Sequence, residues 1–247
     1  MAGTADRIEG WADKWSADII PFHQGDVNPC LIKWCFKLAH DDQPRKFLVP
    51  LCGKSVDMMW LYKKGHTVVG IEGVEKAIVQ FFTENDLKYT KSPTGAGQLF
   101  QTADGRLQLH QADICEMDPG LIGPVDAIWD RGSYVAIYCE DRPKYAKFMK
   151  GVMSRKCHYL LSAVEYDSSL FSGPPRHLSE DDIKNDCGSF AKVECLTCDE
   201  LTVETFPKMA KWNLKEWKEL PVDEFTLLLF RFDHRAEEMR MTCRKVP

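Results

Sequence analysis

The sequence lacks any apolar run long enough to span a bilayer, and residues 1–6 contain no apolar stretch of the kind that a secretory signal requires. It also lacks an excess of basic residues, because 32 lysines and arginines face 37 aspartates and glutamates, for a net charge of -5. Without a basic field, nucleic acid and anionic lipid are poor partners. We therefore expect a cytoplasmic protein that acts on small molecules, with neither nucleic acid nor a membrane as partner.

The ten cysteines lack the spacing of a disulfide scaffold. Cys52, Cys157 and Cys195 lie inside apolar strand patterns, which suits reduced thiols in a cytosolic protein. The pair Cys195-x-x-Cys198 has no second pair and no histidine at zinc spacing. We expect no metal.

No repeat, low-complexity segment or change in composition divides the chain. With 247 residues and 44% hydrophobic content, it is long enough to bury a substantial core. We expect one domain over residues 1–247, with a frayed, charged tail at 233–247.

The most informative stretch is residues 47–54, an apolar run that stops at Gly53 and passes into a helical pattern. A short apolar run of this kind predicts a strand buried on both faces of a parallel sheet. A second such strand is predicted at 66–71, and Glu72 stands at its end. A carboxylate about 20 residues beyond the first glycine turn is placed to accept hydrogen bonds from a ribose diol.

The glycine turn contains a single Gly rather than G-x-G-x-x-G. A pyrophosphate needs several bare backbone amides, so an adenosyl group without phosphate fits this loop better. The alternative is that Gly53 only ends a strand and that Glu72 is a solvated loop acid.

Ile8, Trp11, Ala12 and Trp15 recur at helical spacing, and a break follows at 21–25. The tryptophans suit core packing. The alternative to this commoner use is a segment that folds over a cofactor, where an aromatic face favours a cation such as a sulfonium. Asn28-Pro29 then supplies a cap and a first-turn proline for the next helix.

Further strands are predicted at 106–114, with Asp113 near the end, and at 124–129, 158–164, 191–196 and 224–232. The glycine-rich stretch 92–105 is predicted to be an irregular excursion or a hairpin. Alternating strands and helices predict an α/β fold with a doubly wound, mostly parallel sheet of about seven strands, in which the late strand is antiparallel.

Asp130 and Arg131 follow the strand 124–129 at the sheet rim where α/β ligands bind. Adjacent opposite charges at this rim are suited to catalysis, with Asp130 as a proton acceptor and Arg131 as a partner for an anion. The alternative is a local salt bridge at a strand end.

Six short motifs occur in order: Trp11-x-x-x-Trp15, Phe22-His23-Gln24, Pro50-Leu51-Cys52-Gly53-Lys54, Val69-Gly70-Ile71-Glu72, Ile128-Trp129-Asp130-Arg131-Gly132 and Gly173-Pro174-Pro175. Together they make residues 8–212 resemble the thiopurine S-methyltransferase family. The resemblance implies a Rossmann-like class I methyltransferase that is a monomer. Its cofactor would be S-adenosylmethionine, and its reaction methyl transfer to the sulfur of an aromatic or heterocyclic thiol.

The resemblance also implies residue roles. Residues 1–27 would form a cofactor-covering segment, Glu72 would hold the ribose, and Asp113 and Ile114 would lie beside the adenine. Arg131 would lie near the methionyl end of the cofactor and the acceptor. The cofactor-binding residues implied are Trp11, Trp15, Phe22, Leu51, Gly53, Glu72, Asp113, Ile114 and Arg131, and the substrate-binding residues are Phe22, Arg131 and Lys208.

Ser133, Arg176, His177 and Lys208 differ from the family's residues, and all four are expected on the acceptor side. Two other functions stay open: a protein that binds S-adenosylmethionine without turnover, and a nicotinamide-dependent oxidoreductase. The single-Gly loop argues against the second.

Overall fold

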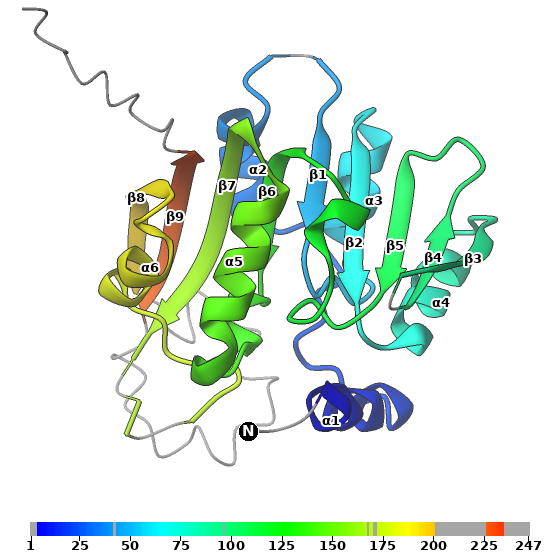
Figure 1. The fold of residues 1–247 in the computed structure, drawn as a ribbon, viewed down its shortest axis with the longest axis horizontal. Helices are drawn as coiled ribbons and strands as arrows, with labels where there is room; N and C mark the ends of the chain where they lie inside the picture. Colours follow the sequence, from blue (N-terminus) through cyan, green and yellow to red (C-terminus); the bar gives the residue numbers. More distant parts are fainter. Residues whose placement is uncertain are drawn as a thin grey trace, which may run out of the picture.

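The computed structural model describes residues 4–41, 43–95, 97–166, 168–169, 172–200 and 226–234. Its centre is one nine-stranded sheet with the order β3-β4-β5-β2-β1-β6-β7-β9-β8 (Figure 1). The strands are β1 (Lys46–Val49), β2 (Thr67–Glu72), β3 (Thr90–Thr94), β4 (Gly97–Gln101), β5 (Leu107–Gln111), β6 (Val125–Arg131), β7 (Met153–Glu165), β8 (Ala191–Glu200) and β9 (Thr226–His234).

The middle of the sheet is parallel, since β5, β2, β1, β6 and β7 all pair in the same direction. The last strand, β9, runs antiparallel to both β7 and β8. These seven strands confirm the predicted doubly wound sheet with an antiparallel late strand. The excursion at 92–105 does contain a hairpin, β3–β4, which extends the sheet beyond β5.

Helices cover both faces of this sheet (Figure 1). One apolar cluster joins the strands to α5 (Arg142–Val152) and α6 (Glu180–Cys187), and a second joins them to α2 (Pro29–Leu38), α3 (Val56–Lys63) and α4 (Glu75–Glu84). Neighbouring strand residues go to opposite clusters: Leu48 to the first, Phe47 and Val49 to the second. This two-sided burial explains why the parallel strands read as continuous apolar runs.

Local caps set the helix boundaries where the sequence places them. Asn28 accepts a hydrogen bond from the Cys30 N–H ahead of α2, with Pro29 in the first turn. Ser179 and Asp182 form the reciprocal capping box of α6. The largest difference from the predicted strand boundaries is at β7, which begins at Met153, five residues before the predicted start at 158, because Met153 already pairs with Val125 of β6.

The helix α1 (Thr4–Ser16) lies at the carboxyl end of the parallel strands, below the arrowheads of β1, β2 and β5 (Figure 1). Trp15 packs with Val74 and Ala77 at the start of α4, in an apolar cluster separate from the two main ones. Lys76 of α4 donates from Nζ to the Trp15 carbonyl at 2.7 Å. The N-terminal segment is therefore held on the face where ligands bind in α/β sheets.

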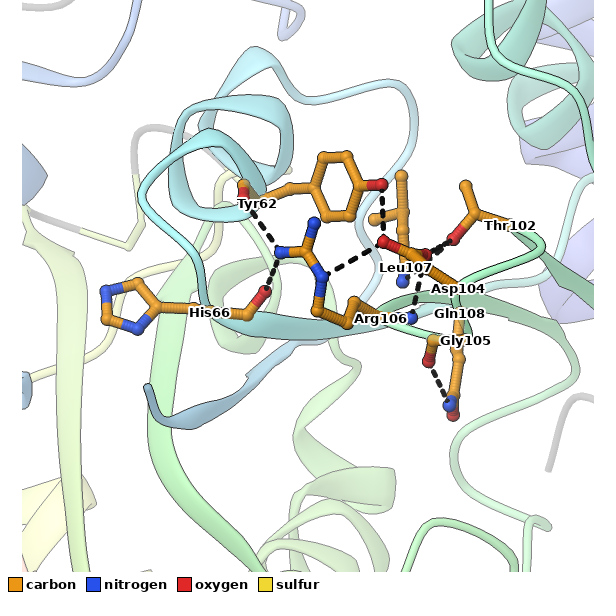
Figure 2. Close-up of polar contacts among 8 residues, drawn as sticks. All are labelled: Tyr62, His66, Thr102, Asp104, Gly105, Arg106, Leu107 and Gln108. Carbon is orange, nitrogen blue, oxygen red and sulfur yellow. Dashed lines mark hydrogen bonds and ion pairs between the residues drawn. The ribbon is translucent and has the colours of Figure 1, made fainter. Parts of the chain in front are cut away.

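The opposite end of the sheet is held by a polar cluster (Figure 2). The Asp104 carboxylate, in the β4–β5 turn, accepts from the hydroxyl of Tyr62 at 2.9 Å and from Arg106 Nε at 3.0 Å. The guanidinium lies 4.4 Å from the centre of the Tyr62 ring, and it donates to the Tyr62 carbonyl. These contacts join the end of α3 to the turn before β5. The Asp104 carboxylate also accepts from the Thr102 hydroxyl, and this bond is the largest cause that lowers the pKa of Asp104 to about 2.

Within the described ranges, no helix is both long enough and apolar enough to cross a membrane. The same part of the chain contains no group of three or more histidine, cysteine, aspartate or glutamate side chains arranged to hold a metal ion. The remaining helical segments of the described residues are short 3-10 turns, at Pro119–Leu121, Tyr134–Ala136 and Cys139–Asp141.

Candidate active site

A cavity of about 640 Å³ opens at the carboxyl end of the parallel strands. Its wall is built from the loops after β1, β2, β5 and β6, from the N-terminal segment and from residues 173–175. The predicted cofactor residues all line it: Trp11, Trp15, Phe22, Leu51, Gly53, Glu72, Asp113, Ile114 and Arg131. Lys208, the remaining predicted substrate residue, lies outside the described residues.

The loop after β1 has the backbone of a tight cradle. Leu51 has φ +38° and Gly53 has φ +51°, so both lie in the left-handed region that glycine adopts readily and leucine rarely does. A Cβ on Gly53 would lie 3.1 Å from Trp15. Gly53 is therefore required both by its backbone angle and by the close approach of the N-terminal segment.

Glu72 is buried at the end of β2, with 7% of its surface exposed. Its Oε2 accepts from the Gly53 N–H at 2.9 Å, and its Oε1 accepts from the Val74 N–H at 2.8 Å. Burial raises the pKa of this carboxyl, although the backbone N–H groups lower it. Glu72 is thus not a solvated loop acid, because it ties the loops after β1 and β2 together. Each carboxylate oxygen has a second acceptor site for a ligand hydroxyl.

Asp113 and Ile114 lie on the next part of the wall, just beyond β5. The Asp113 Oδ1 accepts from the Cys115 N–H at 2.9 Å, which fixes the loop, and Ile114 is 1% exposed. Because β5 pairs with β2, this second carboxylate stands at the strand end beside Glu72. The wall here offers two acceptor groups and an apolar surface side by side.

Three aromatic rings from the N-terminal segment close the cavity. Phe22 lies edge-to-face with Trp11 at 5.5 Å and with Trp15 at 5.8 Å between ring centres. Trp15 is 2% exposed. The tryptophan rings therefore form a small core and also line the cavity.

Arg131 connects this segment to the sheet. Its Nη1 donates to the Phe22 carbonyl at 2.9 Å. Burial lowers the pKa of the guanidinium, and the nearby negative charge of Asp57 acts in the opposite direction. Arg131 therefore brings a positive charge to the cavity wall from a guanidinium that is itself largely buried.

Asp57 is a wall residue that the sequence reasoning missed. Its side chain is buried at the start of α3, where it accepts from the Asn28 N–H and from the Trp129 indole N–H, both at 2.8 Å. It thereby links the N-terminal segment, α3 and β6. The feature of the sequence that could have indicated Asp57 is its place as an acid in the first turn of the helix that follows the glycine loop.

Asp130 requires a correction. It is fully buried and is absent from the described residues that line the cavity. Its Oδ2 accepts from the hydroxyls of Tyr145 at 2.5 Å and Tyr159 at 2.6 Å, and its Oδ1 accepts from the Tyr134 N–H at 3.1 Å. Successive residues of β6 alternate between the two faces, so Asp130 points under α5 while Arg131 reaches the cavity. The geometry therefore does not support Asp130 as a base for the acceptor or as a salt-bridge partner of Arg131.

Three of the four residues expected on the acceptor side lie among the described residues, and none of the three lines the cavity. Ser133 is fully buried, and its hydroxyl donates to the Pro50 carbonyl at 2.6 Å, so it braces the loop after β1 from behind the wall. His177 accepts from the Tyr166 N–H with Nδ1. Arg176 stacks on Tyr138, which does line the cavity beside residues 173–175. Among the described residues, Ser133, Arg176 and His177 thus support the wall without forming it.

The family model of thiopurine S-methyltransferase (TPMT) matches residues 7–222 of the chain. A probable thiopurine S-methyltransferase from Danio rerio is 39% identical over 202 residues, 79% of this chain and 87% of the relative. The thiopurine S-methyltransferase of Canis lupus familiaris is 36% identical over 192 residues, 76% and 78% of the two chains. Magnesium protoporphyrin IX methyltransferase from Synechocystis PCC 6803, solved with bound SAM, shares 11% identity and a TM-score of 0.59, covering 96% of this chain and 100% of that one. This last similarity supports the fold alone.

Proposed function

Because the chain belongs to the thiopurine S-methyltransferase family, we propose that its cavity transfers a methyl group from S-adenosylmethionine to the sulfur of an aromatic or heterocyclic thiol of the thiopurine type. The products are the S-methyl thioether and S-adenosylhomocysteine. The observation that carries the proposal is the convergence of the predicted cofactor residues on one cavity at the carboxyl ends of the strands.

The residues present fit the cofactor. The loop at Gly53 is too close to Trp15 for a larger side chain, and Glu72 stands beside it with acceptor sites for a ribose diol. Asp113, at the neighbouring strand end, is suited to the exocyclic amine of adenine. The absence of a G-x-G-x-x-G loop agrees with a ligand that has no pyrophosphate.

S-adenosylmethionine supplies a methyl group already activated on a sulfonium, so the protein's contribution is alignment and exclusion of water. Trp11, Trp15 and Phe22 provide an apolar cover and aromatic faces suited to a positively charged sulfur. Arg131, held by the Phe22 carbonyl, favours the thiolate form of the acceptor, because a neighbouring positive charge lowers a thiol pKa.

Asp130 then has a positioning role. With two tyrosine hydroxyls and one backbone N–H as donors, it anchors the turn that begins at Arg131 from below. No strong base is needed, since aromatic thiols ionise near neutral pH. We propose further that the protein is a monomer and that it acts in the cytoplasm, where free thiols such as those of Cys52 and Cys157 stay reduced.

The test is methyl transfer from labelled S-adenosylmethionine to matched panels of thiols, phenols and amines. We expect label in the thiol products and little in the others. Transfer mainly to phenols or amines would refute the acceptor. Binding of S-adenosylmethionine without transfer to any thiol would favour a non-catalytic protein, and binding of NAD in its place would favour an oxidoreductase.

A further inference from the structure

Tyr138 forms an exposed part of the cavity wall on the side away from the predicted adenosyl site. It is 42% exposed and lies beyond the end of β6, near Arg131 in the chain. Glu72 and Asp113, the residues suited to the adenosyl group, stand instead at the ends of β2 and β5. Because β1 separates β6 from β2, Tyr138 belongs to the acceptor end of the cavity.

One face of the Tyr138 ring is covered by Arg176, whose Cζ lies 3.9 Å from the ring centre. The arginine is fixed by two more contacts to the same loop. Its backbone N–H donates to the Val135 carbonyl at 2.6 Å, and its Nη1 donates to the Ala136 carbonyl at 3.1 Å. The guanidinium is therefore held against the loop as a backing for the phenol ring.

A cation on one face of an aromatic ring offsets the negative potential of that ring. An unbacked phenol face would repel the electron-rich ring of a thiolate. A face backed by a guanidinium accepts such a ring more readily, because the positive charge behind it attracts the anion. The ring also offers a flat surface of the size that a heteroaromatic acceptor requires for offset stacking.

We propose that Tyr138, backed by Arg176, is the specificity-determining wall that selects flat heteroaromatic thiols in their anionic form. The inference rests on the proposed methyltransferase function and deepens it by naming the charge state and shape of the acceptor. Tyr138 acts by direct contact with the acceptor, whereas Arg176 acts through Tyr138 and is a positioning residue.

The experiment compares two acceptors under saturating S-adenosylmethionine: a heteroaromatic thiol that is ionised at the assay pH, and an aliphatic thiol of similar volume that is not. The readout is the ratio of their kcat/KM values. Tyr138→Leu should lower this ratio about three- to tenfold, the range expected for an aromatic contact. Arg176→Gln should lower it about two- to fivefold, the range for a cation–π contact. Tyr138→Phe keeps the ring and should keep the ratio.

The matched control is Arg155→Gln, which removes an exposed arginine from the amino-terminal half of β7, away from the cavity, and should not move the ratio. Calorimetric binding of S-adenosylmethionine and thermal unfolding are measured for every variant. Should Arg176→Gln unfold, Tyr138→Leu still decides, because the tyrosine is an exposed residue.

Unchanged ratios in both Tyr138→Leu and Arg176→Gln would overturn the inference. A loss in Arg176→Gln with none in Tyr138→Leu would also overturn it, and would make Arg176 a direct anion contact. Failure of the proposed function looks different, since the wild-type protein would then methylate neither thiol.

Discussion

Replacing Glu72 by glutamine removes one of the two acceptor oxygens that hold the loops after β1 and β2, while it preserves the shape of the side chain. Both oxygens of the carboxylate accept backbone N–H bonds, from Gly53 at 2.9 Å and from Val74 at 2.8 Å. In glutamine the amide nitrogen is a donor, so one of these N–H groups faces another donor and loses its partner. We therefore expect Glu72→Gln to reduce both stability and cofactor affinity.

The size of the stability effect follows from these contacts. A lost hydrogen bond to a charged group costs about 1.5 to 3 kcal/mol. Removing a buried charge offsets part of this loss, since burial is the main reason that the pKa of Glu72 is raised. The lower end of the range is therefore expected, about 1.5 kcal/mol. In a chain of this size each kcal/mol lowers Tm by roughly 2–4 °C, so Tm should fall by roughly 3–6 °C.

The cofactor effect has a separate origin. A diol that donates to a carboxylate gains a charge-assisted hydrogen bond, and its loss should raise the Kd of S-adenosylmethionine about tenfold. Thermal unfolding without ligand and calorimetric titration with it measure the two effects independently. Glu75→Gln is the control, because this neighbouring carboxylate is exposed, pairs with Lys91 and lies off the cavity wall. An unchanged Tm would refute the loop tie, and an unchanged Kd would remove Glu72 from the cofactor site.

Four other changes give distinct outcomes. Arg131→Ala should lower turnover of a thiol of high pKa more than that of a thiol already ionised at the assay pH, and equal losses across a pH series would leave it as a cofactor residue only. Deleting residues 1–21 should leave a folded domain by circular dichroism that binds S-adenosylmethionine poorly, because the cluster around α1 is separate from the two main cores; an unfolded product would show that this segment is part of the core. Asp130→Ala leaves two buried tyrosine hydroxyls without an acceptor and should lower the free energy of unfolding in urea by roughly 2 to 5 kcal/mol. A variant that is as stable as wild type but impaired in proton transfer would instead support Asp130 as a catalytic base. Asp104→Asn should lower the free energy of unfolding by less than about 1 kcal/mol at neutral pH, because the ion pair of Asp104 with Arg106 is exposed. The pKa of Asp104 is about 2 in the folded protein against an ordinary 3.8, so the difference in stability from wild type should disappear as the pH falls through about 2. A difference that persists below that pH would exclude the Asp104 carboxylate as its source.

Periodicity predicted most of the fold because the parallel strands are buried on both faces and the helices on one. The start of β7 was missed, since its first residues, 153–157, include two exposed basic side chains and read as a loop. Pairing with β6 nevertheless places them in the sheet. Neighbouring strands can thus override the composition of a short segment.

The wall residues named as cofactor-binding were predictable because they follow strand ends, where α/β ligands bind, or because they match family motifs. The role of Asp130 was not, since one position along β6 decides whether a side chain enters the cavity or the core. Asp57, Tyr138 and the contact between Tyr138 and Arg176 were missed for another reason. Their partners are far away in the chain: Asp57 and Trp129 are 72 positions apart, and Ala136 and Arg176 are 40 positions apart.

In the proposed function the cavity wall has an adenosyl half and an acceptor half, and the bond from the Arg176 N–H to the Val135 carbonyl lies within the acceptor half. The adenosyl half depends on strand ends and on Glu72, where almost any exchange disturbs the backbone of two loops. The acceptor half consists of two loops that brace each other. Mutations that change the ring at 138 and its backing at 176 together can therefore alter the range of thiols over generations, while the methyl donor and its site are inherited intact.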